Sequence, residues 1–266
     1  MLVGGFVAAV VLWAATNFVR ARLSVFDRQP IDGYDDYDSL TAALRQLQKR
    51  FPTRSHLYSI GKSAEGRHLW ALSVSAEQAD RHLPLRPELL YVANMHGDEP
   101  VGRQLLLQLA FDLLHNCTEK KDGSSKRAAN LLEEKCKRLL QNSRVHLMPS
   151  ANPDGFELAL KAARSGDMED GGCHPESLGR ENARDVDLNR DFPELSMAND
   201  RRFHRHFQPE TQALMNWFQK VPFILAGSLH GGARVVNVPY DLQNISFFAK
   251  SIRNVSGASP DNDVYW

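Results

Sequence analysis

The sequence predicts a globular fold of the α/β class. Short apolar runs, which are typical of buried strands, alternate along the chain with segments whose apolar residues recur at helical spacing. The length of 266 residues allows one large domain, or one domain with a short appendage. A content of 42% hydrophobic and 24% charged residues is typical of a globular chain that buries a sizeable core.

The charge balance argues against one class of partner. Lys+Arg and Asp+Glu both number 32, so the formal net charge is zero. This balance does not suggest a field of a single sign, and we expect no general electrostatic attraction to nucleic acid.

The amino-terminal segment is the candidate appendage. Residues Leu2 to Val19 are almost wholly apolar, and Arg20 and Arg22 follow them. This length lies at the lower limit for crossing a bilayer. We interpret residues 1–22 as a signal peptide or membrane anchor, which predicts a secreted, extracellular or membrane-associated protein. A buried amino-terminal helix is the alternative interpretation.

Asparagines and cysteines give mild support to that location. Three triplets have the pattern of N-glycosylation acceptors, and they begin at Asn116, Asn244 and Asn254. The three cysteines, which have no metal-binding spacing, are Cys117, Cys136 and Cys173. One disulfide with one free thiol is compatible with this number, and the pairing stays open.

The folded domain is expected to begin with a helix over Tyr34 to Arg50. Leucines at helical spacing form its apolar stripe, and Asp38 or Ser39 is the expected N-cap. Pro52 follows the end of the helix, as expected for a residue that cannot continue it.

Strands and helices then alternate. Strands are expected at Leu57–Ile60, His68–Val74, Glu88–Ala93, Arg144–Met148, Phe223–Leu229 and Val235–Val238. Helices are expected at Gln104–Leu114, Ala128–Leu140 and Leu158–Ala163. Between them, the segment Asn152–Gly155, which reads Asn-Pro-Asp-Gly, is interpreted as a structural turn.

A candidate metal site lies where the strand Glu88–Ala93 leads into the next helix. His96 and Glu99 occupy this turn, and their spacing brings an imidazole and a carboxylate within reach of one metal ion. A catalytic zinc usually takes three protein ligands and a water, so a third ligand is required. The alternative is that Glu99 simply lies near the positive end of the helix, where an acid is favoured.

Two further motifs lie later in the chain. The segment Gly179–Pro193 contains Arg180, Asp187 and the pair Asn189–Arg190, and arginine is well suited to binding a carboxylate through two parallel hydrogen bonds. A solvated, charged loop is the alternative. His230 ends the apolar run Phe223–Leu229, at the kind of position where α/β proteins place ligand sites. A buried histidine of the core is the alternative there.

Taken together, these motifs resemble a known family. His96-x-x-Glu99, Gly179-Arg180 to Asn189-Arg190 and Leu229-His230-Gly231-Gly232 occur in the order and approximate spacing of zinc metallocarboxypeptidases. The chain is most similar to the regulatory branch, which includes carboxypeptidases D, E, M and N, and to carboxypeptidase D most of all. The resemblance covers residues 34–266. It implies an α/β domain with a mixed central sheet and helices on both faces.

The resemblance also implies roles for the metal-site residues. His96, Glu99 and His230 would bind one Zn²⁺ and leave a fourth position for water. Asp187 would accept a hydrogen bond from the far nitrogen of His96 and so fix its tautomer. Arg180 would stabilise the oxyanion of the tetrahedral intermediate.

The substrate roles follow in the same way. Asn189 and Arg190 would hold the terminal carboxylate of a peptide or protein substrate, which predicts an exopeptidase. Asp241 would lie at the floor of the specificity pocket and select carboxy-terminal Lys or Arg, because a desolvated carboxylate requires a cationic partner.

One part of the family's machinery is absent from the sequence. These enzymes use a glutamate as general base, on a strand well beyond the second histidine, and no glutamate occurs between His230 and Trp266. We therefore interpret residues 34–266 as a catalytic domain whose carboxy-terminal part is missing. General-base assistance is typically worth about 10²–10⁴ in rate, so we expect the chain as given to be nearly inactive.

Two classes of function are compatible with these features. The first is a zinc carboxypeptidase that removes carboxy-terminal residues, of which the sequence is a fragment. The second is a truncated, non-catalytic protein that binds peptide carboxy termini through Arg180, Asn189 and Arg190. The intact set of metal ligands favours the first. A zinc amidase or deacylase on a related scaffold is less favoured, because the Asn189–Arg190 pair points to a peptide carboxylate.

Overall fold

The computed structural model confirms the α/β class. It describes residues 34–115, 117, 127–165, 178–193, 206–232 and 235–236. In chain order the elements are α2 (Tyr37–Arg50), β1 (Ser55–Lys62), β2 (His68–Val74), β3 (Glu88–Ala93), α3 (Pro100–His115), α4 (Arg127–Asn142), β4 (Arg144–Met148), α5 (Pro153–Ser165), η2 (Leu188–Arg190), α6 (Pro209–Lys220) and β5 (Phe223–Leu229).

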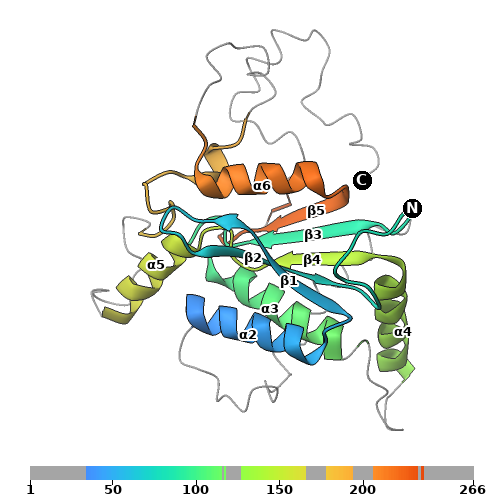
Figure 1. Cartoon of the computed structure of the whole chain (residues 1–266). Coiled ribbons are helices and arrows are strands. Elements are labelled where there is room, and N and C mark those ends of the chain that lie inside the picture. Colours follow the sequence, from blue (N-terminus) through green and yellow to red (C-terminus); the bar gives the residue numbers. More distant parts are fainter. Residues whose placement is uncertain are drawn as a thin grey trace.

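The described strands form one mixed sheet in the order β1-β2-β4-β3-β5 (Figure 1). The β1–β2 and β2–β4 pairs are antiparallel, whereas β3 runs parallel to both β4 and β5. β3 is therefore a central strand, and its near-continuous apolar sequence is the pattern expected for a strand that is covered on both faces.

Helices cover both faces of this sheet, as predicted. α2 and α3 lie on one face and α6 lies on the other (Figure 1). Leucines of α2 and α3 pack in one core cluster with Leu89, while Leu214 and Trp217 of α6 pack in a second cluster with Leu90. Consecutive residues of β3 thus point into opposite cores, as the alternation of side chains along a strand requires.

The strand register brings distant motifs to one edge of the sheet. Ala93 at the end of β3 pairs with Leu229 at the end of β5. The two strands are parallel, so the segments after them, which carry His96 and His230, leave the sheet on the side where the carboxyl ends of both strands lie. The sheet thereby brings together residues that lie far apart in the sequence.

Two sequence-based expectations about helix starts are wrong. Asp36, rather than Asp38 or Ser39, caps α2, because its carboxylate accepts a hydrogen bond of 2.9 Å from the Ser39 amide. Asn-Pro-Asp-Gly is not an isolated turn but the start of α5. Asn152 Oδ1 accepts a 2.9 Å bond from the Gly155 amide, and proline is well tolerated in a first helical turn.

The last strand also differs from its expected environment. β5 was expected to be buried, but its residues alternate between half-buried and exposed, and Ile224 is 67% exposed. Among the described strands β5 is an edge strand and pairs only with β3, so its other edge is unpaired there. The alternating exposure shows that one of its faces is not covered by the described residues. Val235 and Val236 are not in a strand, and the rest of that predicted strand lies outside the described residues.

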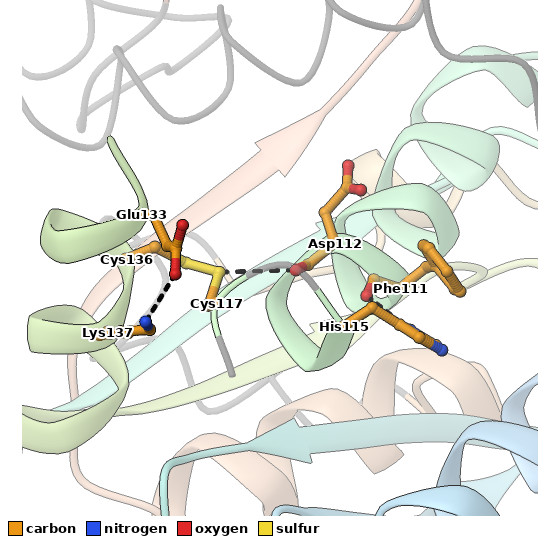
Figure 2. The surroundings of a disulfide bond; sticks show 7 residues. All are labelled: Phe111, Asp112, His115, Cys117, Glu133, Cys136 and Lys137. Carbon is orange, nitrogen blue, oxygen red and sulfur yellow. Dashed lines mark hydrogen bonds and ion pairs between the residues drawn. A yellow bond between two sulfur atoms is a disulfide. The ribbon is translucent and has the colours of Figure 1, made fainter. Parts of the chain in front are cut away.

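A disulfide links Cys117, just beyond α3, to Cys136 of α4 (Figure 2). The two Cα atoms are 5.5 Å apart, a usual separation for such a bond. This settles a pairing that the sequence left open. Cys173 and the amino-terminal segment 1–22 lie outside the described residues. None of the helices within the described ranges is long and apolar enough to cross a membrane.

Candidate functional site

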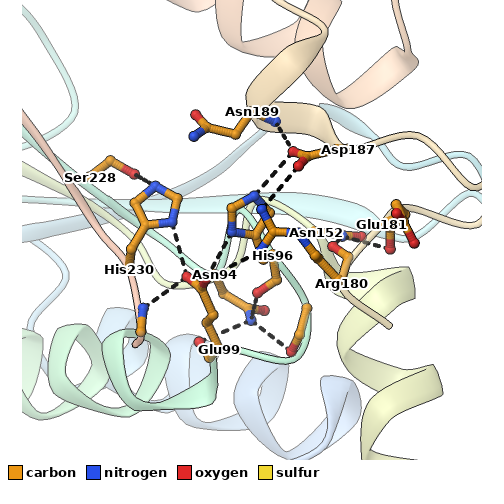
Figure 3. Close-up of polar contacts among 12 residues, drawn as sticks. Asn94, His96, Glu99, Asn152, Arg180, Glu181, Asp187, Asn189, Ser228 and His230 are labelled. Carbon is orange, nitrogen blue, oxygen red and sulfur yellow. Dashed lines mark hydrogen bonds and ion pairs between the residues drawn. The ribbon is translucent and has the colours of Figure 1, made fainter. Parts of the chain in front are cut away.

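The turn after β3 is shaped by a buried asparagine. Asn94 has a positive φ of 55°, a conformation that asparagine tolerates better than most residues. Its Nδ2 donates to the carbonyl oxygens of His96 at 2.8 Å and Gly97 at 3.0 Å, and its Oδ1 accepts from Ser150 Oγ at 2.7 Å. These bonds fold the turn so that the His96 and Glu99 side chains lie on the same side (Figure 3).

Three glycines permit a very close approach behind this turn. A Cβ on Gly97 would lie 2.2 Å from the backbone of Gly155 and Phe156, and 2.4 Å from the carbonyl oxygen of Gly179. The Gly97 amide donates to the Arg180 carbonyl at 3.3 Å. The turn after β3, the start of α5 and the loop of residues 178–193 are thus packed backbone against backbone.

Three potential metal ligands meet at the edge of the sheet. His96 Nδ1 lies 2.9 Å from Glu99 Oε1, and His230 Nδ1 lies 2.9 Å from Glu99 Oε2 (Figure 3). One ligand atom from each residue falls within 4.8 Å of the other two. His96 is buried and Glu99 half-buried, whereas His230 is exposed among the described residues.

The electrostatics of this cluster favour an ionised carboxylate. Burial would raise the pKa of Glu99, but hydrogen bonds with His230, His96 and the Gly231 amide outweigh it and hold that pKa well below its usual range. Burial would likewise lower the pKa of His96, but the hydrogen bond with Glu99 and the negative charges of Glu99 and Asp187 together outweigh it and raise that pKa. The site therefore already stabilises a positive charge beside Glu99.

Asp187 and Arg180 extend the cluster on its other side. Asp187 Oδ1 lies 3.1 Å from His96 Nε2, and Asp187 Oδ2 accepts a 3.0 Å bond from Arg180 Nη2. Arg180 Nη1 also lies 3.6 Å from Glu99 Oε1. Burial would raise the pKa of Asp187, but attraction to His96 and Arg180 lowers it, so the aspartate remains ionised.

The predicted carboxylate clamp lies next to this cluster, on η2. The Asn189 backbone amide donates to Asp187 Oδ1 at 2.8 Å, which fixes the start of η2 beside the site. The Arg190 side chain is exposed and donates to the Asn189 carbonyl at 3.1 Å. Asp241, the predicted specificity residue, lies outside the described residues.

Asn152 is a contributor that the sequence interpretation missed. It is fully buried, and its Nδ2 donates to the carbonyl oxygens of Arg180 at 3.2 Å and Glu181 at 3.0 Å. Asn152 thereby ties the start of α5 to the loop that carries Arg180. The Asn-Pro-Asp-Gly segment was the available signal, but an asparagine before a proline is equally typical of an ordinary turn.

Comparison with known proteins agrees with this geometry. The sequence pattern of the family described as zinc carboxypeptidase matches residues 40–263. The catalytic chain of human carboxypeptidase N is 36% identical over 245 residues, covering 86% of this chain and 49% of the human protein. Mouse carboxypeptidase M is 38% identical over 232 residues, covering 87% of this chain and 45% of the mouse protein.

Other relatives extend the pattern. Carboxypeptidase D of Drosophila melanogaster is 37% identical over 208 residues, which cover 78% of this chain and 13% of the fly protein. The chain spans about half the length of the carboxypeptidase N and M chains that it matches, and much less of carboxypeptidase D.

A solved structure supports the fold. The crystal structure of carboxypeptidase A from Helicoverpa armigera superimposes with a TM-score of 0.56 at 21% identity, over 87% of this chain and 54% of that one. The family match covers most of the chain and includes all three residues of the His96–Glu99–His230 cluster. This protein belongs to the zinc carboxypeptidase family.

Proposed function

We propose that this chain forms a zinc-dependent exopeptidase site that removes carboxy-terminal residues from peptides and proteins. The observation that carries the proposal is the convergence of His96, Glu99 and His230, with ligand atoms within 4.8 Å of one another. Family membership supports the same reaction, although the relatives that the chain matches are about twice its length.

The chemistry of the three donors fits zinc. Two imidazole nitrogens and one carboxylate oxygen are typical ligands of a catalytic zinc, which keeps a further position for water. The His230 side chain is 31% exposed and that of Glu99 15%, so an ion held there would be accessible from solvent at this face of the described structure. When bound, zinc would supply Lewis-acid activation of water and of the scissile carbonyl.

The neighbouring residues would orient both the ligands and the substrate. Asp187 Oδ1, 3.1 Å from His96 Nε2, would accept a hydrogen bond from the Nε2–H group and so leave Nδ1 as the ligand atom. Arg180, held by Asp187, would donate to the developing oxyanion as a fixed positive group. Asn189 and Arg190 would bind the terminal carboxylate of the substrate.

We propose a preference for carboxy-terminal Lys or Arg, with Asp241 as the residue that would select the positive side chain. We also propose that residues 1–22 direct the protein into the secretory pathway, where residues 2–19 would serve as signal or membrane anchor and residues 34–266 would form the catalytic domain. The Cys117–Cys136 disulfide supports an oxidising compartment.

Zinc binding is the first test. The metal-free chain is titrated with zinc in competition with a coloured chelator, and Co²⁺ absorption reports the ligand geometry. We expect one ion per chain and a loss of affinity of at least about 100-fold in His230→Ala, which exceeds the usual cost of losing an outer hydrogen-bond partner. His68→Ala removes an exposed histidine as a control. Equal zinc affinity in wild type and His230→Ala would overturn the proposed site.

Catalysis is tested separately from metal binding. If the reading frame of the source transcript continues past Trp266, we expect the longer product to release Lys or Arg from peptide termini. Asp241→Ala in that product should lose the basic preference, and retained preference would contradict the role of Asp241. If no longer product exists, binding of peptide carboxy termini without cleavage becomes the better account of the site.

A further inference from the structure

A buried carboxylate is hydrogen-bonded to the loop that carries Arg180, and the proposed reaction gives it no role. Glu210, in the first turn of α6, is fully buried. Its Oε1 accepts a 2.8 Å bond from the Ala64 amide, and its Oε2 accepts a 3.2 Å bond from Asn182 Nδ2. Both of these partners are neutral donors, so each carboxylate oxygen is committed to a separate N–H group.

Asn182 in turn shapes the loop that carries Arg180 and Asp187. Its Oδ1 accepts from the amides of Arg184 at 3.0 Å and Val186 at 3.2 Å. Its backbone amide donates to the Val186 carbonyl at 3.0 Å, and its carbonyl accepts from the Asp185 amide at 3.0 Å. Asp185 adopts a positive φ of 54°, so the turn is tight and depends on these bonds.

This turn decides whether Arg180 and Asp187 can meet. Arg180 precedes it and Asp187 follows it, and their side chains pair at 3.0 Å. Asp187 then contacts His96 and the Asn189 amide. A turn that opened would separate Arg180 from Asp187 and displace the start of η2.

We propose that Glu210 is a positioning residue for this loop: by holding the Asn182 amide group, it keeps Arg180, Asn189 and Arg190 in the geometry that recognises a peptide carboxylate. The inference rests on the proposed function for its ligand and on the described contacts for the positioning itself. Glu210 touches neither the metal ligands nor the clamp residues in the described contacts, so its effect passes through Asn182.

The anchor of Glu210 on the other side explains why it can resist movement. Ala64, its second partner, lies in the turn between β1 and β2, and the neighbours of Ala64 in that turn are bound to α5. Ser63 Oγ and the Glu65 amide donate to the two oxygens of Asp154, at 2.7 and 2.8 Å. Glu210 therefore connects the loop to a turn that is itself fixed to the helix beside the site.

The test is Glu210→Gln, which preserves shape. Glutamine has one acceptor oxygen and one NH₂ group, so one of the two N–H partners must face a donor instead of an acceptor. Hydrogen exchange by NMR then reports the Arg184 and Val186 amides. We expect their exchange to accelerate by about tenfold or more, as loss of a bond to a charged group predicts, while amides of β3 change much less.

A second readout addresses function. Binding of a Lys-terminated peptide with a free carboxylate is compared with binding of its carboxy-terminal amide by the zinc-loaded chain. We expect Glu210→Gln to lose at least about tenfold of the preference for the free carboxylate while keeping its zinc affinity within a few-fold. Glu88→Gln is the matched control, because it removes another fully buried carboxylate at the opposite end of β3 and should leave this preference unchanged.

A swap of donor and acceptor provides a rescue. In Glu210→Gln combined with Asn182→Asp, glutamine donates to the new carboxylate, which still accepts from the Arg184 and Val186 amides. Gln208, whose Oε1 accepts from Asn182 Nδ2 at 3.1 Å, turns its side-chain amide over and donates to the carboxylate as well. We expect slow exchange to return in this variant, which also serves as the test if Glu210→Gln alone does not fold. A folded swap variant with fast exchange at both amides would overturn the proposal.

The remaining outcomes distinguish the positioning role of Glu210 from the proposed function. Unchanged amide exchange at Arg184 and Val186 in Glu210→Gln overturns the positioning role. Exchange that accelerates equally at these two amides and at the amides of β3 also overturns it, because a uniform acceleration reports only a loss of global stability. If the wild-type chain shows no preference for the free carboxylate, the proposed function fails, while the exchange data still decide whether Glu210 holds the loop.

Discussion

Asp187 Oδ1 lies 3.1 Å from Nε2 of His96, on the side of the imidazole opposite to Glu99. The ring is therefore held between two carboxylates, one of which is bonded to Arg180 as well. A histidine fixed in this way presents Nδ1 to the centre of the His96–Glu99–His230 cluster.

This relationship predicts the effect of Asp187→Ala on zinc affinity. Without the carboxylate, the tautomer and orientation of His96 are no longer fixed, so we expect affinity to fall about 10–100-fold in a chelator competition. Glu181→Ala is the control, because it removes an acid of the same loop but keeps the backbone carbonyl to which Asn152 donates. Unchanged affinity in Asp187→Ala would show that His96 is oriented by other contacts.

Gly97→Ala should damage both stability and the metal site. The new methyl group would lie 2.2 Å from backbone atoms of Gly155 and Phe156, which cannot move away as a flexible side chain can. We expect a loss of about 1–3 kcal/mol or more in urea denaturation, together with weaker zinc binding.

A glycine of the sheet provides the comparison. In Gly227→Ala, the added Cβ would meet the Tyr91 ring at 3.2–3.3 Å, and that ring can shift. We expect a clearly smaller loss of stability there, and zinc binding close to that of the wild type. Equal effects of the two substitutions would contradict the close backbone packing around Gly97.

Stability should fall in acid because of a buried cluster at the start of β3. Burial would raise the pKa of Glu88, but hydrogen bonds with His146 and Arg144 outweigh it and lower that pKa from 4.5 to about 2. Its stabilising contribution, on the order of 3 kcal/mol, is present above pH 4.5 and is lost as the pH falls toward 2. Burial also lowers the pKa of His146 below 6.5, so loss of stability begins below that pH.

The measurement is the free energy of unfolding of the metal-free chain between pH 7 and 2. Glu88→Gln should be less stable at pH 7, because it leaves the buried Arg144 without a negatively charged partner, but its stability should fall less steeply below pH 4.5. Glu99 and Asp187 titrate in both proteins, so the difference between the two curves reports the cluster of Glu88 with His146, whose own pKa depends on Glu88. Parallel curves would contradict the lowered pKa of Glu88.

The disulfide should stabilise the fold without affecting the site. Cys117 and Cys136 are separated by 19 residues, and opening such a loop typically costs about 3 kcal/mol. We expect a loss of that size in urea denaturation of Cys117→Ser with Cys136→Ser, with zinc affinity unchanged because the bond lies beyond the far end of α3 (Figure 2). Reducing agent should destabilise the wild type but not the variant, and equal sensitivity would contradict this pairing.

Local sequence determined much of this protein. The strands β2, β3, β4 and β5 have the predicted bounds, because each is a largely apolar run that is bounded by polar or turn-forming residues. The turn carrying His96 and Glu99 was likewise readable, since a three-residue spacing is a local property. The family was recognisable because its motifs are short and ordered along the chain.

The tertiary structure decided which distant residues meet. The approach of His230 to Glu99, across 131 residues, depends on the parallel pairing of β3 with β5. The exposure of β5 depends on its place in the strand order, and the bond between Asn182 and Glu210 depends on where α6 packs. Periodicity reports only the face that a residue prefers, whereas strand order and buried polar contacts are set by the packing of the whole domain.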